Sequence, residues 1–267
     1  MTWNPAQYLQ YEDARLRPAF ELLARIRCAA PATVVDLGCG AGNVAQYLAA
    51  RWPGASIEGV DGDAAMLERA GAATAGDGRY AWTRCDLAAW QRREAVDVLY
   101  SNAALHWLDG HAQLFPRLFA CVAPGGELAV QMPDNFRAPS HQALFDVASL
   151  ERWRERLSAH VRRDPVAGIA RYHAWLEPLA AALDLWATEY LQLLPRRPDG
   201  EHPVVAWMRG TALLPFLGAL EEAERKAFAG EFAARIEAAY PRRADGSVPF
   251  PFRRIFIVAV RGEASAG

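Results

Sequence analysis

Short apolar runs alternate with longer amphipathic stretches through the first half of the chain. The short runs end at glycine or at polar residues, as buried parallel strands do. Between them, apolar positions recur at helical spacing, for example over residues 43–52. Alternation of this kind predicts βαβ units and a mostly parallel sheet. The five predicted strands are residues 33–37, 56–60, 80–84, 96–100 and 127–132.

After Pro133 the pattern changes from alternation to long helical stretches. Residues 140–182 and 203–239 carry Arg, Trp and Ala at helical spacing, and two further strand-like runs follow them or lie between them. We therefore predict one α/β core with inserted helices. The predicted divisions are a leading helical segment at 1–30, a core at 31–134, helical cap insertions at 135–184 and 203–240, and two final strands at 185–194 and 251–261.

Composition fits this picture and excludes several classes of protein. Of the 267 residues, 52% are hydrophobic and 22% are charged, which is typical of a globular chain. A formal net charge of -2 gives no field that would attract nucleic acid or an anionic membrane. The four cysteines form no C-x-x-C pair, so neither a disulfide framework nor a metal site is expected. Without a signal-peptide pattern or a membrane-length apolar run, we expect a cytoplasmic location.

A glycine-rich segment, Gly38-Cys39-Gly40-Ala41-Gly42, joins the first predicted strand to the next helix. Glycines there permit a tight turn and let a ligand approach the main chain, which predicts a nucleotide-like ligand. The third glycine comes one residue too early for the dinucleotide fingerprint, which disfavours NAD. The P-loop motif is also missing, because the one lysine of the chain is Lys226.

Polar residues follow the next three predicted strands. Asp61 comes twenty-one residues after Gly40, where a carboxylate can accept both hydroxyls of a ribose. Asp86 follows the third strand, where it can face an adenine amino group, and the polar run 101–107 follows the fourth. Each feature alone is equally compatible with a turn or a helix cap. Together they predict a cofactor site that differs from an NAD site by Asp86.

These four features together resemble the class I methyltransferases, whose pattern is an acid before G-x-G-x-G, an acid ending strand two, an acid after strand three and a polar loop after strand four. The resemblance implies a Rossmann-like fold, with a seven-stranded mostly parallel sheet, helices on both faces and a helical cap. It also implies S-adenosyl-L-methionine as the cofactor. The implied cofactor-binding residues are Asp36, Gly38, Cys39, Gly40, Gly42, Asp61, Gly62, Met66, Asp86, Leu87, Asn102 and Ala103.

Beyond the cofactor core, the chain resembles the trans-aconitate 2-methyltransferase family nearly end to end. Trp3-Asn4-Pro5, residues 15–18, Gln131-Met-Pro-Asp-Asn135 and residues 251–259 carry the resemblance. It departs at Leu214, where the family tends to have arginine. The resemblance implies that residues 1–30 form a lid and that a small carboxylic acid accepts the methyl group as an ester.

A carboxylate acceptor needs no general base, because a carboxyl group with a pKa near ~4 is already ionised at neutral pH. We therefore predict no catalytic residue, only residues that position the acceptor. Arg253 and Arg254 are weighed as further candidates, but a solvated surface charge is the favoured interpretation of both. The predicted acceptor-binding residues are Trp3, Tyr8, Arg15, Arg17, His106, Trp107, Gln131 and Asn135.

Three alternatives remain open at the level of the sequence. One is a methyltransferase that acts on a malonyl group of a carrier protein, for which the helix at residues 152–163 offers a basic face. Another is a methyltransferase of secondary metabolism. The third is a non-enzymatic partner protein that binds the cofactor without transferring its methyl group. The oligomeric state is not predicted.

Overall fold

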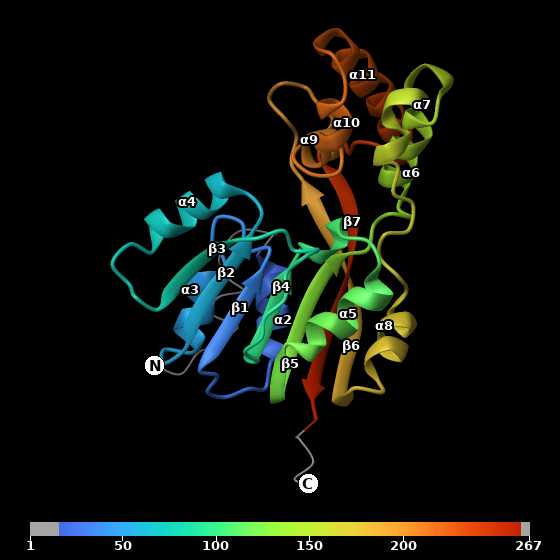
Figure 1. Cartoon of the computed structure of the whole chain (residues 1–267). Coiled ribbons are helices and arrows are strands. Elements are labelled where there is room, and N and C mark those ends of the chain that lie inside the picture. Colours follow the sequence, from blue (N-terminus) through green and yellow to red (C-terminus); the bar gives the residue numbers. More distant parts are fainter. Residues whose placement is uncertain (1–15, 263–267) are drawn as a thin grey trace. The chain divides into compact units, whose positions relative to one another are not determined.

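The computed structural model describes residues 16–262, and its centre is a seven-stranded sheet with the order β3-β2-β1-β4-β5-β7-β6 (Figure 1). Strands β1 to β5 pair in parallel, and β7 pairs antiparallel with β5. The predicted seven-stranded, mostly parallel Rossmann-like sheet is thereby confirmed. The strands are β1 (Thr33–Leu37), β2 (Ser56–Asp61), β3 (Tyr80–Arg84), β4 (Val96–Asn102), β5 (Val122–Pro133), β6 (Ala180–Leu194) and β7 (Val248–Arg261).

The two final strands begin earlier than the pattern predicted. Strand β6 begins at Ala180 rather than at residue 185, and β7 begins at Val248 rather than at residue 251. The first residues of β6 are alanines, which carry little strand signal. Because β6 lies at the edge of the sheet, most of its side chains are also only partly buried, and the usual apolar alternation is weak.

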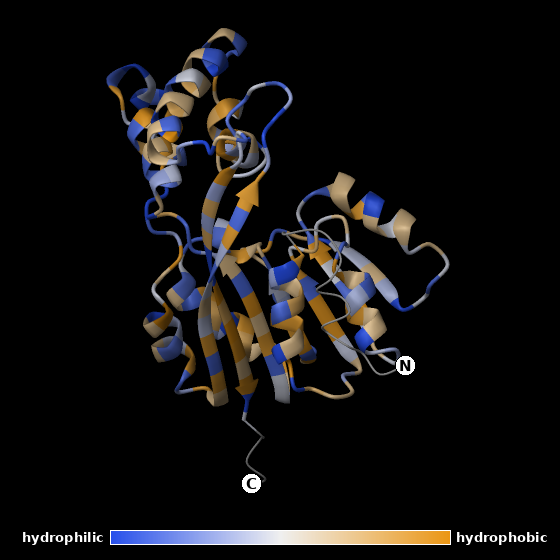
Figure 2. Ribbon diagram, turned by 180° about the vertical axis from the view of Figure 1, so that it is seen from behind, coloured by the Kyte–Doolittle hydropathy of each residue, from blue (hydrophilic) through white to orange (hydrophobic). Residues whose placement is uncertain are grey.

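Helices cover both faces of this sheet. Figure 1 shows α5 and α8 on one face, whereas the view from behind in Figure 2 shows α2 and α3 on the other. Tyr100 of β4 donates a hydrogen bond from its hydroxyl to the main-chain oxygen of Ala19 in α2, at 3.0 Å. The helical segments of this part are α2 (Arg17–Arg25), α3 (Ala45–Arg51), α4 (Ala64–Ala73), η1 (Leu105–Trp107), α5 (His111–Ala120) and α8 (Ile169–Leu176).

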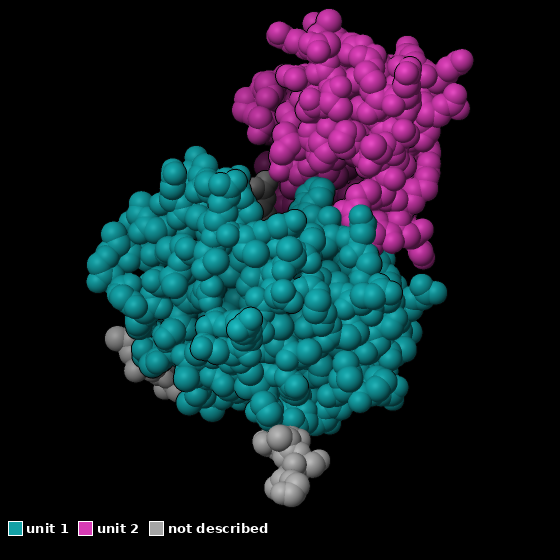
Figure 3. Space-filling model, in the orientation of Figure 1, with its two compact units in different colours: residues 1–133, 166–188, 254–267 teal, residues 134–165, 189–253 magenta. Residues whose placement is uncertain are grey.

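The chain divides into two compact units, coloured separately in Figure 3. The first contains residues 1–133, 166–188 and 254–267, and the second contains residues 134–165 and 189–253. The second unit has its own apolar core, in which Phe228, Phe232 and Leu144 are fully buried. Its helical segments are α6 (Pro139–Ala148), α7 (Glu151–Leu157), η2 (Ser158–His160), α9 (Pro203–Arg209), α10 (Leu214–Gly218) and α11 (Glu222–Ala239).

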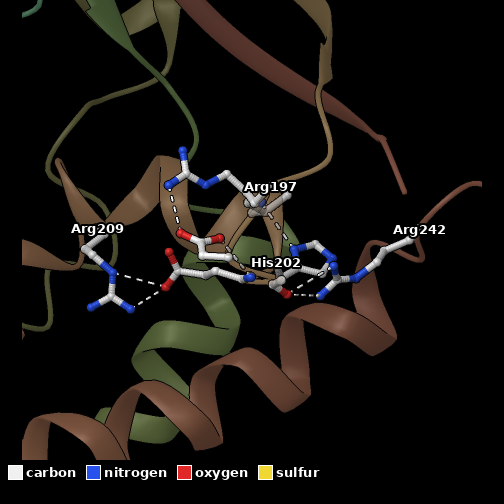
Figure 4. Close-up of polar contacts among 8 residues, drawn as sticks. Arg197, His202, Arg209 and Arg242 are labelled. Carbon is white, nitrogen blue, oxygen red and sulfur yellow. Dashed lines mark hydrogen bonds and ion pairs between the residues drawn. The ribbon is translucent and has the colours of Figure 1, made fainter. Parts of the chain in front are cut away.

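The boundaries of the second unit differ from those of the predicted cap. Helix α8 and the first part of β6 group with the sheet, whereas the loops around residues 195–202 and 241–247 group with the helices. His202 organises one of these loops: its Nδ1 accepts from the main-chain N–H of Val204 at the start of α9, and its Nε2 donates to the main-chain oxygen of Tyr240 (Figure 4). Nearby, Arg209 pairs with Glu201.

Candidate functional site

The glycine segment forms a tight turn directly after β1. Gly38, Gly40 and Gly42 all adopt positive φ angles, of 75°, 53° and 74°. A Cβ atom on Gly38 would lie 2.1 Å from the Cβ of Ala104, whereas one on Gly40 would meet no atom within 4 Å. Gly38 is therefore required by close packing as well as by its backbone angle. The main chain at Gly40 instead borders open space, as a ligand-binding turn requires.

Asp61 ends β2 beside this turn, and main-chain donors fix the orientation of its carboxylate. Its Oδ2 accepts from the N–H of Gly40 and its Oδ1 accepts from the N–H of Asp63, each at 2.9 Å. A carboxylate oxygen can accept more than one hydrogen bond, so both oxygens retain capacity for the hydroxyls of a ligand. The predicted ribose acid is thus held in place by the glycine turn itself.

A pocket of about 680 Å³ opens at this end of the sheet, within the first unit. It is lined by six predicted cofactor residues and by one predicted acceptor residue, Trp107, whose side chain is half exposed. The six are Gly38, Asp61, Gly62, Asp86, Leu87 and Ala103. The structure therefore brings together residues that follow four different strands.

Four residues of the pocket wall were not singled out in the sequence, namely Arg84, Cys85, Ala104 and Leu108. All four adjoin predicted site residues, so extending each strand-end motif by one or two residues would have found them. Arg84 also donates from its Nε to the main-chain oxygen of Gly62 at 3.2 Å, which fixes the turn after β2.

The other predicted cofactor residues do not line the pocket. Asp36 and Cys39 are buried, Gly40 and Gly42 belong to the turn, Asn102 ends β4, and Met66 lies partly exposed in the first turn of α4. Cofactor contacts by these residues stay a prediction.

Asp36 is a buried carboxyl group at the end of β1. Its side chain is 2% exposed, and its Oδ2 has no hydrogen-bond partner among the described residues. Burial, followed by the nearby charge of Asp61, raises the pKa of Asp36 to about 7. An unpartnered buried acceptor at this position is suited to a ligand that carries a donor or a positive charge, such as an ammonium group.

The loop after β4 contains a strained residue. Ala103 has a φ angle of 55°, and within residues 16–262 it is the one non-glycine residue with a positive φ. Its N–H donates to the main-chain oxygen of Gln131 in β5 at 2.9 Å, which holds this conformation. Strain of this kind is retained where the surrounding structure fixes it, commonly at functional sites. The neighbouring turn η1 places His106 inside and Trp107 at the pocket.

The predicted acceptor residues have diverse surroundings. Trp3, Tyr8 and Arg15 lie outside the described residues. Arg17 is exposed on α2 and donates to Glu21 at 2.9 Å. Binding of an acceptor by any of them stays a prediction.

Asn135 belongs to the second unit, where both polar atoms of its amide bond to the main chain of Arg253. Its Nδ2 donates to the oxygen at 3.0 Å, and its Oδ1 accepts from the N–H at 2.8 Å. This side chain thus joins the segment after β5 to β7, and its role at an acceptor stays a prediction.

The two neighbouring arginines of β7 differ sharply. Arg253 is exposed and pairs with Asp134 at 2.9 Å, as a surface charge does. Arg254 is 6% exposed, and its Nη1 lies 3.3 Å from the Oε1 of the fully buried Gln131. The interpretation of Arg254 as a solvated surface charge is therefore wrong. Side chains alternate between the two faces of β7, so one of two adjacent arginines faces inward and the other outward. The sequence alone does not show which of the two faces inward.

Within residues 16–262, no group of three or more His, Cys, Asp or Glu side chains could hold a metal ion. None of the helices described is both long enough and apolar enough to cross a membrane.

Known proteins provide an independent comparison. A model of the methyltransferase domain matches residues 34–126. The trans-aconitate 2-methyltransferase of Paracidovorax citrulli is 46% identical, over 97% of this chain and 98% of the relative. That of Streptomyces coelicolor is also 46% identical, over 99% of this chain and 88% of the relative.

Among solved structures, a putative methyltransferase from Bacillus halodurans superposes with a TM-score of 0.57 at 14% identity, covering 91% of this chain and 97% of that one. This likeness supports the fold. The sequence relatives support more, because their identity extends over both units. The chain belongs to the trans-aconitate 2-methyltransferase family.

Proposed function

We propose that this chain transfers the methyl group of S-adenosylmethionine to a carboxylate oxygen of trans-aconitate or a similar small polycarboxylate. Membership of the family makes the chain a methyltransferase with S-adenosylmethionine as its cofactor. The acceptor is the proposed part. The observation that carries it is the 46% identity over nearly the whole chain to relatives named for trans-aconitate.

The pocket at the end of the sheet fits the cofactor. We assign the ribose to the two oriented oxygens of Asp61, the adenine to Asp86 and Leu87 in the pocket wall, and the methionine part to the open space at the main chain of Gly40. The unpartnered Oδ2 of Asp36 supplies an acceptor for the ammonium group. When bound, the cofactor supplies an electrophilic methyl group on a sulfonium ion.

The residues of the protein then need to position the acceptor rather than to remove a proton from it. A carboxylate is already ionised at neutral pH, so the attacking oxygen carries its lone pair without a general base. Rate enhancement comes from alignment of the oxygen with the methyl carbon and from exclusion of water. Trp107, half exposed at the pocket wall, provides an apolar surface for this purpose.

Ion pairs within the second unit weaken the support for the carrier-protein alternative. Arg152, Arg156 and Arg163, which would form a basic docking face, pair with acidic side chains of their own unit. Their partners are Glu231, Glu224 and Asp146, respectively. Paired arginines present less net positive charge to an acidic partner, so a free acid is favoured over a carrier-bound one.

The test is a comparison of acceptors at equal concentration. Purified protein is incubated with S-adenosylmethionine and trans-aconitate, cis-aconitate, isocitrate or malonyl carrier protein, and S-adenosylhomocysteine is quantified. We expect the highest kcat/KM with trans-aconitate and the formation of a monomethyl ester, identified by mass spectrometry. Turnover with malonyl carrier protein and with none of the free acids would disprove the proposal.

A further inference from the structure

We propose that Arg254 and Gln131 form a subsite that binds a carboxylate of the acceptor other than the one that is methylated. This inference rests on the proposed function, because it assigns a position to the acceptor. It identifies a residue that determines specificity, at a place in the fold where the sequence favoured a surface charge.

The register of the sheet places the two side chains together. Gln131 of β5 is opposite Asn102 of β4, and Arg254 of β7 is opposite Pro133, two residues after Gln131. Because side chains alternate along a strand, Asn102, Gln131 and Arg254 share one face of the sheet. Tyr100 precedes Asn102 by two residues and reaches α2, so this is the face that α2 covers.

The polar atoms at this place define the kind of ligand. Gln131 is fully buried and its Oε1 faces Arg254, while its Nε2 has no hydrogen-bond partner among the described residues. An amide donor left without a partner is unfavourable when it is buried, so it favours a ligand that can accept from it. The guanidinium of Arg254, buried alongside, matches a carboxylate in charge and in planar geometry. Two donor groups, one of them cationic, thus lie next to each other in the interior.

The subsite adjoins the cofactor pocket through the main chain. The oxygen of Gln131 accepts the N–H of Ala103, and Ala103 lines the pocket. On the other side of β4, the carboxylate of Asp61 lies beside the glycine turn and would repel an acceptor carboxylate. An acceptor with several carboxylates is therefore oriented with its anchoring group at Arg254 and its reacting group towards the methyl donor.

The same donors could instead hold the carboxylate of the cofactor's methionine part, so the experiment measures both ligands. Isothermal titration calorimetry gives the affinity for S-adenosylhomocysteine, and then the affinity of the S-adenosylhomocysteine complex for trans-aconitate. The variants are Arg254→Met and Gln131→Glu. The matched control is Arg253→Met, which removes the adjacent, exposed arginine.

We expect Arg254→Met to weaken trans-aconitate binding about 10-fold to 100-fold, the loss of a charge-assisted contact, and to change S-adenosylhomocysteine affinity less than about threefold. Gln131→Glu is isosteric, keeps an oxygen facing Arg254 and adds a negative charge that competes with the ligand. It should weaken trans-aconitate binding at least as much. If Arg254→Met does not fold, Gln131→Glu by itself still tests the subsite. The control should bind both ligands as the unsubstituted protein does.

Two results would overturn the subsite. One is unchanged trans-aconitate affinity in folded Gln131→Glu or Arg254→Met. The other is a selective loss of S-adenosylhomocysteine affinity, which would assign the donors to the cofactor. A failure of the proposed function is distinguishable: the unsubstituted protein would then bind trans-aconitate through Arg254 without methylating it. Absence of any trans-aconitate binding would refute the subsite itself.

Steady-state kinetics add a readout that general damage would not reproduce. Crotonate has one carboxylate, which must serve as the methyl acceptor, so it leaves the subsite empty. Arg254→Met should lower kcat/KM for trans-aconitate about 10-fold to 100-fold and should change the value for crotonate little. An equal loss with both acids would show that Arg254 does not bind a second carboxylate.

Discussion

The end of the sheet where strands β1 to β5 terminate has two halves whose side chains differ in charge. Strands β1, β2 and β3 are associated with the acids Asp36, Asp61 and Asp86, whereas β4, β5 and β7 carry Asn102, Gln131 and Arg254. The acidic half offers acceptors, which suit hydroxyl, amino and ammonium groups. The other half offers amides and a guanidinium, which suit carboxylates. The contrast teaches how one sheet can offer separate places to two ligands of opposite charge: in our proposal the cationic methyl donor binds at the acidic half and the anionic methyl acceptor at the other half.

The strongest test of the acidic half is Asp61→Ala. This change removes charge-assisted hydrogen bonds to two hydroxyls, so we expect S-adenosylhomocysteine affinity to fall by about 3–6 kcal/mol, measured by calorimetry. Asp63→Ala is the control, because it removes the side-chain N-cap of α4. It should lower the free energy of unfolding by about 1 kcal/mol and leave the affinity for S-adenosylhomocysteine unchanged. Equal affinities of the two variants would place the ribose elsewhere.

The glycine turn of the acidic half can be tested with two matched substitutions. Gly38→Ala combines an unfavourable positive φ with a contact of 2.1 Å to Ala104, so the free energy of unfolding should fall by about 3–5 kcal/mol in urea denaturation. Gly40→Ala has the strain without the contact, and should cost about 1–2 kcal/mol. If Gly40→Ala proves as costly as Gly38→Ala, close packing is not what requires the first glycine.

Asp36 predicts a pH dependence of stability. Its pKa of about 7 in the folded protein exceeds the ordinary value of 3.8, so between these values the folded state binds a proton that the unfolded chain releases. Stability should therefore fall as the pH rises from about 4 to 7, and stay lower above that. Between pH 5 and 8 the free energy of unfolding should fall by on the order of 2 kcal/mol. Asp36→Asn should abolish this fall in denaturation curves recorded over the same range. Parallel curves for both proteins would refute this assignment.

The smallest effect is expected outside both halves. Arg156→Ala removes an exposed pair with Glu224 in the second unit, and exposed pairs contribute little to stability. We expect an unchanged melting temperature and an unchanged kcat/KM for the free acid. If Arg156→Ala lowers activity with a carrier-bound acceptor alone, this helix does bind a carrier protein, contrary to what its ion pairs indicate.

Local patterns predicted the acidic half well. The glycine turn and the acid at Asp61 are short-range features, because a strand that ends at a glycine needing positive φ constrains its own neighbours. Gly38 of this turn lines the pocket, together with Asp61 and Asp86. The boundaries of β6 and of the second unit were predicted less closely, because an alanine-rich edge strand has little apolar alternation.

The sequence by itself determined the alternating architecture, the acid that ends β2 and the acid that follows β3, since each depends on residues close together in the chain. It also determined the family, since each matching motif is a short run of neighbouring residues. The tertiary structure alone decided that Arg254 faces inward and meets Gln131, which lies 123 positions away. It also decided that Asp36 is buried beside a second carboxyl group. Such contacts depend on strand order and register, which place distant residues on one face and which no local pattern of hydrophobicity specifies.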